Sequence, residues 1–142
     1  MSGWDLPYRT EIAVRLRDLD PMGHVNNAVY ATYFEEARED YFADVLGKGR
    51  LADLNTVTVT QRIDYREPIP ADRDAVVVRA GVVDIGEKSL DLHYEIRLDG
   101  TTAATAETVQ VVYDTNSEET RPVPSEWRSR IEDYQSRERS AD

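Results

Sequence analysis

The chain has 142 residues, of which 40% are hydrophobic and 32% charged, and this size and composition fit one globular domain with its own core. The absence of cysteine excludes a disulfide-stapled fold and argues against a structural zinc site, which usually takes thiolate ligands. The 28 acidic and 17 basic residues give a net charge of −11, which repels phosphate backbones and argues against nucleic acid as a partner.

The sequence also bears on where the protein works. No run approaches the roughly 18 consecutive apolar residues of a membrane span, and the first five residues lack the basic and apolar parts of a signal peptide. We therefore expect a cytoplasmic protein with no membrane partner. Only two of the 17 basic residues are lysines, a balance that resembles salt-adapted proteins. An ordinary acidic protein explains it equally well, because net charge speaks to solubility and not to fold.

The first predicted strand covers residues 10–17, where Ile12, Val14 and Leu16 recur at period two. From residue 30 the apolar positions take helical spacing, which predicts one long helix that ends at Gly47. The apolar stripe of this helix comprises Tyr30, Tyr33, Phe34, Ala37, Tyr41 and Val45. Asn26 or Asn27 can cap its N-terminus, since a short amide side chain accepts hydrogen bonds from the first turn.

From residue 55 onward the apolar period is two, which predicts four further strands. They cover residues 55–65, 75–85, 90–98 and 102–113. Residues 75–85 carry enough valine to be buried on much of both faces. The dipeptide Asp99-Gly100 is a strong hairpin signal between the last two strands.

A short amphipathic helix is predicted after Pro124, with Trp127, Ile131 and Tyr134 on one face. Residues 136–142 are expected to form a disordered tail, which leaves a single domain over 1–142 with its core at about 8–135. The order strand, long helix, then four strands predicts an α+β domain in which an antiparallel sheet of about five strands curves around the long helix. A doubly wound parallel sheet would need helices between the later strands, and the pattern has none.

The densest polar constellation is the loop at residues 18–27, between the first strand and the long helix. The carboxylate of Asp20 and the imidazole of His24 lie four residues apart, and free N–H groups at the helix start can stabilise an oxyanion. The same residues also fit turn chemistry alone, because Asp18 and Asp20 can form Asx turns before Pro21 and the asparagines can cap the helix. Residue types alone leave both interpretations open.

The loop and the helix after it resemble a known family. Two runs carry the resemblance: Asp20-Pro21-Met22-Gly23-His24-Val25-Asn26-Asn27-Ala28-Val29-Tyr30 and Phe34-Glu35-Glu36-Ala37-Arg38. Both resemble hotdog-fold thioesterases of the 4-hydroxybenzoyl-CoA thioesterase type. It continues at residues 64–68, 86–89, 104–114 and 121–124, and covers about residues 8–135. The resemblance implies a hotdog fold, in which a curved antiparallel sheet wraps a central helix, and hydrolysis of a fatty or aromatic acyl-CoA.

The resemblance assigns roles to three loop residues. Asp20 falls on the family's catalytic carboxylate, which either activates water or attacks the thioester carbonyl itself. Asn27 falls where family members present a backbone N–H to the developing oxyanion. His24 matches a histidine of the long-chain and plant branches and is expected to support catalysis. Asp18 is expected to shape the loop.

Five further residues are expected to contact substrate or CoA. Tyr30 and Phe34 belong to the core stripe of the helix, which explains them without a ligand, but relatives place the acyl pocket beside this helix and the two residues can line it. Glu67 matches a carboxylate of the plant branch, although a solvated strand end also explains it. Lys88 and Ser89 lie in the turn that many relatives place near the CoA phosphates, and a plain polar hairpin turn explains them equally well.

The resemblance implies no metal or redox cofactor, with coenzyme A entering only as part of the substrate. Relatives join their sheets edge to edge as dimers and often pair these into tetramers, so we expect a homodimer or homotetramer. His93 alternates onto the polar side of its strand, which favours solvent or a subunit interface. The alternatives are an acyl-carrier-protein thioesterase, a hotdog hydratase or dehydratase, whose D-x-N-P-x-H pattern differs from this loop, and a non-catalytic acyl-thioester binding protein.

Overall fold

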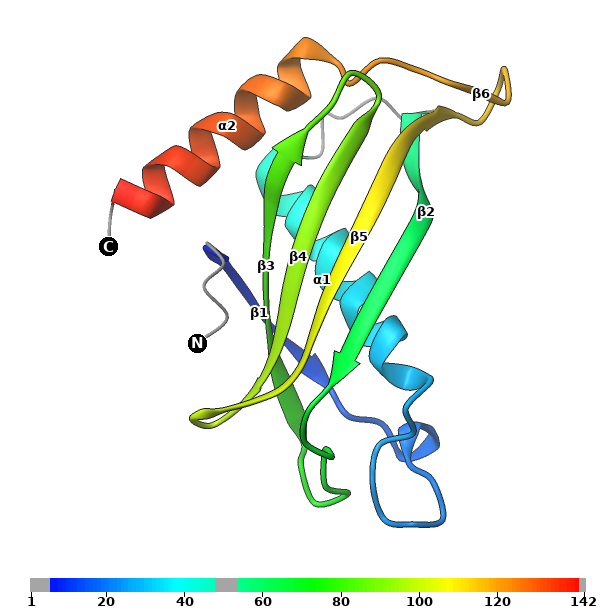
Figure 1. The fold of residues 1–142 in the computed structure, drawn as a ribbon, viewed down its shortest axis with the longest axis vertical. Coiled ribbons are helices and arrows are strands. Elements are labelled where there is room, and N and C mark those ends of the chain that lie inside the picture. The colour runs from blue at the N-terminus through cyan, green and yellow to red at the C-terminus, as the bar shows by residue number, and fades with distance from the viewer. Residues whose placement is uncertain (1–5, 48–53, 141–142) are drawn as a thin grey trace.

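The computed structural model describes residues 6–47 and 54–140. Six strands and two α-helices follow one another along the chain, with a short 3₁₀ helix, η1, after the first strand (Figure 1). Their bounds are β1 Tyr8–Ala13, η1 Leu16–Asp18, α1 Val29–Leu46, β2 Leu54–Tyr65, β3 Ala75–Ile85, β4 Ser89–Leu98, β5 Thr101–Asp114, β6 Glu119–Thr120 and α2 Ser125–Ser140. Among the described residues, no helix is long and apolar enough to span a membrane.

The strands form one antiparallel sheet in the order β1-β3-β4-β5-β2, with the two-residue strand β6 added beside β5. The sheet curves around α1, which lies along its inner face (Figure 1). The predicted α+β hotdog arrangement is confirmed, including the central position of the long helix. The small strand β6 was not predicted, because two residues carry no periodic signal.

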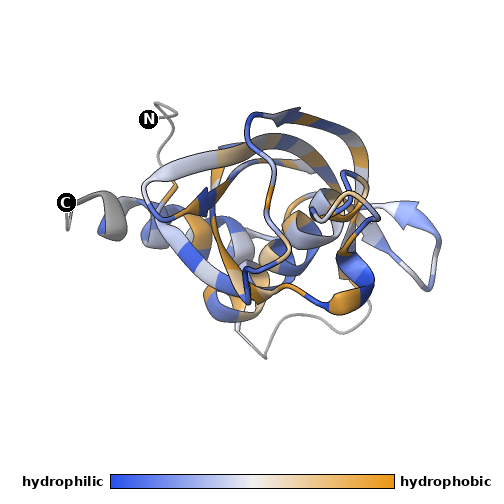
Figure 2. Ribbon diagram, turned by 90° about the horizontal axis from the view of Figure 1, so that it is seen from below, coloured by the Kyte–Doolittle hydropathy of each residue, from blue (hydrophilic) through white to orange (hydrophobic). Residues whose placement is uncertain are grey.

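The core lies between α1 and the inner face of the sheet. All six residues of the predicted helical stripe are buried, and Phe42 and Leu46 extend it. β3 and β4 contribute alternate residues to this core, whereas β2 has no buried residue and adds only the partly buried Leu54 and Ile63. Hydrophilic and hydrophobic segments alternate along the strands that enclose the helix (Figure 2). Valines of β3 are buried on the helix side, but Val83 is 43% exposed, so the prediction of burial on much of both faces is wrong for the end of that strand.

The first strand ends earlier than predicted. β1 stops at Ala13, the chain turns into η1, and Leu16 is 87% exposed although its period-two position predicted burial. The turn forms because the Asp18 carboxylate accepts a hydrogen bond from the Arg15 backbone N–H at 2.9 Å and another from the Tyr33 hydroxyl at 2.8 Å. Polar contacts with the distant helix therefore override the local strand pattern.

The C-terminal helix is longer than predicted. Trp127 and Ile131 bury its apolar face, as their spacing indicated, but α2 continues to Ser140, so placing a disordered tail from residue 136 is wrong up to that point. An ion pair at i,i+4 between Asp133 and Arg137, 3.0 Å apart, supports the added turn. Residues 141–142 lie outside the described residues.

Candidate active site

The loop between η1 and α1 is held in place mainly by its backbone. Leu19 and Val25 form an isolated antiparallel bridge, and His24 forms another with Pro70 in the connection between β2 and β3. The Ala71 N–H also donates to the Gly23 carbonyl at 3.0 Å. Gly23 has a φ of +83°, a conformation that glycine adopts without steric cost. The loop is thus a compact turn braced against the β2–β3 connection.

Asp18 anchors the start of this loop. It is 4% exposed, and its carboxylate accepts hydrogen bonds from the Arg15 N–H and from the Tyr33 hydroxyl on α1. Burial alone would raise the pKa of Asp18, but the hydrogen bonds from Arg15 and Tyr33 outweigh it and lower the pKa. The Asp18 carbonyl also accepts from the Asn26 N–H at 2.8 Å. These contacts fit the loop-shaping role expected for Asp18.

Asp20 is half-buried at the centre of the loop. Its Oδ1 accepts hydrogen bonds from the backbone N–H groups of Met22 at 2.9 Å and of His24 at 3.3 Å. In the part of the chain that the structure describes, Oδ2 has no hydrogen-bond partner. One oxygen therefore fixes the orientation of the carboxylate, while the other remains available to water or to a substrate carbonyl.

His24 forms the isolated bridge with Pro70, and its side chain is half-buried. The Asp20 carboxylate meets the backbone N–H of His24 rather than its imidazole. No hydrogen bond of the imidazole is found within residues 6–47 and 54–140, so a direct carboxylate–imidazole pair is not formed here. The supporting role expected for His24 stays a prediction.

The N-terminus of α1 carries Asn27 at the loop end. The prediction that Asn26 or Asn27 caps the helix is wrong, because the N-cap residue is Ala28 and no side chain caps it. Asn26 Oδ1 instead accepts from the Ala28 N–H at 2.8 Å and forms an Asx turn just before the helix. Asn27 is exposed, and for its N–H the described residues offer no acceptor. A free N–H at a helix N-terminus lies where the helix dipole favours negative charge, so this group can stabilise an oxyanion.

Tyr65, at the end of β2, is a site neighbour that sequence reasoning missed. Its hydroxyl donates to the Asn27 carbonyl at 3.0 Å, and its ring meets the Tyr30 ring edge-on at 4.9 Å. Tyr65 is 48% exposed beside the helix start. An aromatic residue on the last exposed position of a strand was the available signal, but only the fold shows that this strand ends at Asn27.

Tyr30 and Phe34 are core residues in the single chain, with 1% and 0% exposure. The Tyr30 hydroxyl donates to the Glu67 carbonyl at 3.4 Å, and burial raises the pKa of Tyr30. Phe34 packs on Tyr94 with ring centroids 5.3 Å apart. Their place in the helix stripe agrees with the sequence, while their expected contact with an acyl group stays a prediction.

Glu67 lies at the same end of the sheet as Asn27. Its side chain is exposed, and its backbone N–H donates to the Ala103 carbonyl of β5 at 3.0 Å. The structure therefore brings the Glu67 backbone against Tyr30, near the loop that carries Asp20. The carboxylate has no hydrogen-bond or ion-pair partner among the described residues, and its expected contact with substrate stays a prediction.

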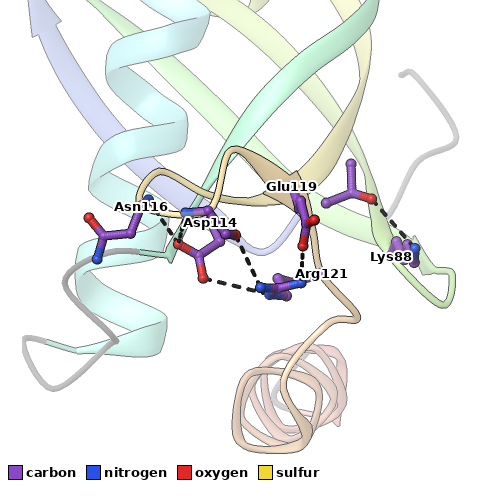
Figure 3. A network of polar contacts seen from close by, with 7 residues as sticks. Lys88, Asp114, Asn116, Glu119 and Arg121 are labelled. Carbon is purple, nitrogen blue, oxygen red and sulfur yellow. Dashed lines mark hydrogen bonds and ion pairs between the residues drawn. The ribbon is translucent and has the colours of Figure 1, made fainter.

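Lys88 and Ser89 lie at the opposite end of the sheet. Ser89 is level with Val111 of β5, whereas Glu67 is level with Ala103, which separates the two ends by roughly 26 Å at about 3.3 Å per residue. The Lys88 ammonium donates to the Thr120 hydroxyl at 3.4 Å, close to an ion-pair network around Arg121 (Figure 3). Within one chain these residues do not meet the Asp20 loop.

Two further predictions concern groups outside the loop. His93 lies on the outer face of β4, and its Nε2 is 3.5 Å from a Glu107 carboxylate oxygen. Burial outweighs the attraction of Glu107 and Asp91 and lowers the pKa of His93. Over residues 6–47 and 54–140, no group of three or more His, Asp or Glu residues is placed to hold a metal ion.

The chain is similar to several known proteins. It is 34% identical to a thioesterase of Thermus thermophilus, whose structure holds coenzyme A and Zn, over 96% of this chain and 98% of that one, with a TM-score of 0.80. A thioesterase-superfamily structure from Jannaschia sp. CCS1 shares the fold, with 18% identity over 88% and 90% of the chains and a TM-score of 0.82.

A curated relative, the uncharacterized protein YsmA of Bacillus subtilis, is 34% identical over 85 residues. That match covers 59% of this chain and 56% of YsmA, so it spans little more than half of the relative's length. The profile of the thioesterase-like superfamily matches residues 14–131, which include the Asp20 loop, α1 and the sheet from β2 to β5. The chain therefore belongs to the thioesterase-like superfamily.

Proposed function

We propose that the protein hydrolyses an acyl-CoA, with a fatty or aromatic acyl group, to the free acid and coenzyme A. The observation that carries this proposal is the loop geometry, in which an oriented carboxylate, Asp20, precedes an open N–H group, that of Asn27, at a helix start. A general base or nucleophile and an oxyanion donor are the two groups that thioester hydrolysis needs. The CoA bound to the similar Thermus protein supports the choice of thioester.

Asp20 can act by either of two routes. As a general base, its free Oδ2 takes a proton from water while the water oxygen attacks the thioester carbonyl, and the C–S bond then breaks to release the thiolate. As a nucleophile, Oδ2 attacks the carbonyl carbon, the thiolate leaves, and water hydrolyses the resulting anhydride. In both routes the carbonyl oxygen becomes negative in the transition state, where the Asn27 N–H stabilises it. Loss of one such donor typically lowers kcat about 10²-fold or more.

The proposal extends to a dimer that joins two β2 strands. β2 is a 12-residue edge strand, and Val57 and Val59 on it are 42% and 54% exposed. A long edge with exposed apolar residues is commonly covered by another strand. A two-fold antiparallel pairing of β2 with its copy sets opposite ends of the two sheets side by side. The partner's Lys88 would then approach the Asp20 loop, where its ammonium and Ser89 can meet CoA phosphates.

Release of free thiol from short, long and aromatic acyl-CoAs tests the activity. We expect turnover of at least one of them by the wild type and a loss of about 10²-fold or more in Asp20→Asn, which keeps the carbonyl-type oxygen that accepts the loop N–H groups but loses the negative charge. Asp72→Asn is the matched control, because Asp72 is an exposed carboxylate in the neighbouring connection.

Circular dichroism must show that both variants are folded. Equal activity of Asp20→Asn and wild type would refute the role of Asp20 while leaving the reaction in place. Absence of thiol release from every acyl-CoA and from acyl-carrier-protein thioesters, combined with retained binding of CoA, would replace hydrolysis by a binding function on the same fold.

A further inference from the structure

A hollow of about 420 Å³ lies on the outer face of the sheet, and none of its lining residues belongs to α1 or to the Asp20 loop. It is lined by Pro7, Arg9, Val77, Arg79, Arg97 and Asp99. Alternate residues of each strand, such as Ile12, Val78 and Ile96, are buried toward the helix, so these lining residues point to the opposite face. The size is within the range of small-molecule sites.

The charge of this hollow contrasts with that of the chain. Three of its six lining residues are arginines and one is an aspartate, in a protein whose net charge is −11. Arg9 on β1 is directly opposite Arg79 on β3, and like charges in such cross-strand positions are destabilising. The carboxylate of Asp99 is already 3.0 Å from the guanidinium of Arg73. The buried Glu95 carboxylate also faces this side of the sheet, directly opposite Arg79 and 3.6 Å from Arg97, and offsets part of the positive charge. Among the described residues, Arg9 is the arginine of this hollow that has no carboxylate partner of its own.

The guanidinium groups differ in how they are held. Arg79 donates through Nε and Nη2 to the Leu6 carbonyl at 3.1 and 2.8 Å, which fixes its position and leaves other N–H groups free. Arg97 donates through Nη1 to the Thr102 hydroxyl at 3.3 Å and lies 3.6 Å from the buried Glu95 carboxylate. For Arg9, the described residues provide neither an ion pair nor a hydrogen bond. Two arginines are oriented by the fold, and the third is uncommitted.

We propose that this hollow binds the phosphate groups of a diphosphate-containing small molecule. Guanidinium groups match phosphate oxygens with paired N–H donors. Arg9, and Nη1 of Arg79, keep donors that no group among the described residues uses. The arginines come from the neighbouring strands β1, β3 and β4, and the outer two of these strands are roughly 10 Å apart. This spacing suits a ligand that carries more than one anionic group. A free nucleoside diphosphate and the nucleotide end of CoA both carry this chemistry.

Calorimetric titration of the whole chain with ADP and with inorganic pyrophosphate, at low and at moderate salt, tests the site. Arg9→Gln should weaken both affinities about tenfold or more, because it removes charged donors to phosphate. Arg9→Lys should fall between, since the charge stays and the paired geometry is lost. Arg62→Gln is the matched control, because Arg62 is an exposed arginine on β2 whose side chain is 71% exposed.

The proposal is overturned if neither probe binds in the millimolar range, or if Arg9→Gln and Arg62→Gln weaken binding equally, which would indicate only general attraction to cations. Arg9→Gln removes no hydrogen bond or ion pair within the described residues and relieves the repulsion from Arg79, so its unfolding transition should be no lower than that of the wild type. Titration with CoA separates the two sources of the ligand. A parallel loss of CoA affinity in Arg9→Gln assigns the hollow to the nucleotide end of CoA, and an unchanged CoA affinity with weakened ADP assigns it to a free nucleotide. Because no turnover is measured, failure of the hydrolysis assay leaves this result intact.

Discussion

Replacement of Tyr33 by Phe removes one hydroxyl from the interior, and it measures how much the hydrogen bond from Tyr33 to Asp18 contributes to the free energy of unfolding. Tyr33 is 0% exposed, and its hydroxyl is one of the donors to the 4%-exposed Asp18 carboxylate, at 2.8 Å. A hydrogen bond to a charged group contributes about 1.5 to 3 kcal/mol, and the carboxylate that remains is too buried for water to replace the donor freely. We therefore expect the free energy of unfolding to fall by about 2 kcal/mol.

Urea unfolding followed by circular dichroism measures this loss. With a typical m value of about 2 kcal/mol/M, the midpoint should fall by about 1 M. Tyr113→Phe is the control, because the Tyr113 hydroxyl has no hydrogen-bond partner among the described residues, and it should change stability by about 0.5 kcal/mol or less. Both chains must be compared at one protomer concentration, since assembly would add to apparent stability.

The pH dependence provides a second reading of the same contact. The pKa of Asp18 is lowered in the folded chain, so its contribution is present above the ordinary pKa of about 3.9 and is lost as the pH falls through the folded value. In Tyr33→Phe the folded pKa moves upward, and the stability difference from wild type should shrink at low pH. A variant within about 0.5 kcal/mol of wild type at pH 7, or a difference that is constant down to pH 3, would refute this account.

Three further predictions concern other parts of the chain. Gly47→Ala should destabilise the protein by about 1 to 3 kcal/mol in thermal unfolding, because Gly47 ends α1 at φ +78° and ψ 176°, a region that side chains avoid. The pKa of His93 is lowered in the folded chain, so the unfolded chain binds the proton first and the free energy of unfolding falls as the pH drops from 7.5 to 5.5. His93→Gln should make this fall smaller, and an equal fall in the variant and the wild type would contradict the prediction. Val59→Lys should yield monomers in sedimentation at micromolar concentration if β2 forms the dimer edge, whereas assembly as in the wild type would exclude that edge.

The element order was predictable because each element carries a local signal. Helical spacing from Tyr30 to Val45 and the period of two in residues 75–98 both reflect burial of one face in the fold. In β2 the same period predicted the strand but not its burial, since none of its residues is buried. The end of β1 was not predictable in this way, since it depends on a hydrogen bond between Asp18 and Tyr33 on the helix. Contacts between distant residues leave no trace in a local pattern.

The candidate site shows the same division. The sequence alone singled out the candidate loop, since Asp20, His24 and Asn27 are close along the chain. It could not show that Asp20 bonds to the His24 backbone, or that Lys88 lies at the far end of the sheet. The outer arginine hollow depends on strand register, which sets Arg9 opposite Arg79 although 70 positions separate them in the sequence.

The bracing of the Asp20 loop has a consequence for how a substrate reaches it. The loop is joined to α1 through Asp18 and to the β2–β3 connection through the His24 bridge and the Ala71 N–H. Opening it as a lid would break all of these at once, and the buried Asp18 carboxylate would lose the Tyr33 hydroxyl. If the proposed hydrolysis takes place in this loop, Asp20 and Asn27 are therefore preorganised for it, with little reorganisation energy left for the chemical step. Under the proposed function, changes in acyl preference should then arise from side chains outside the loop, and leave the geometry of the loop itself intact.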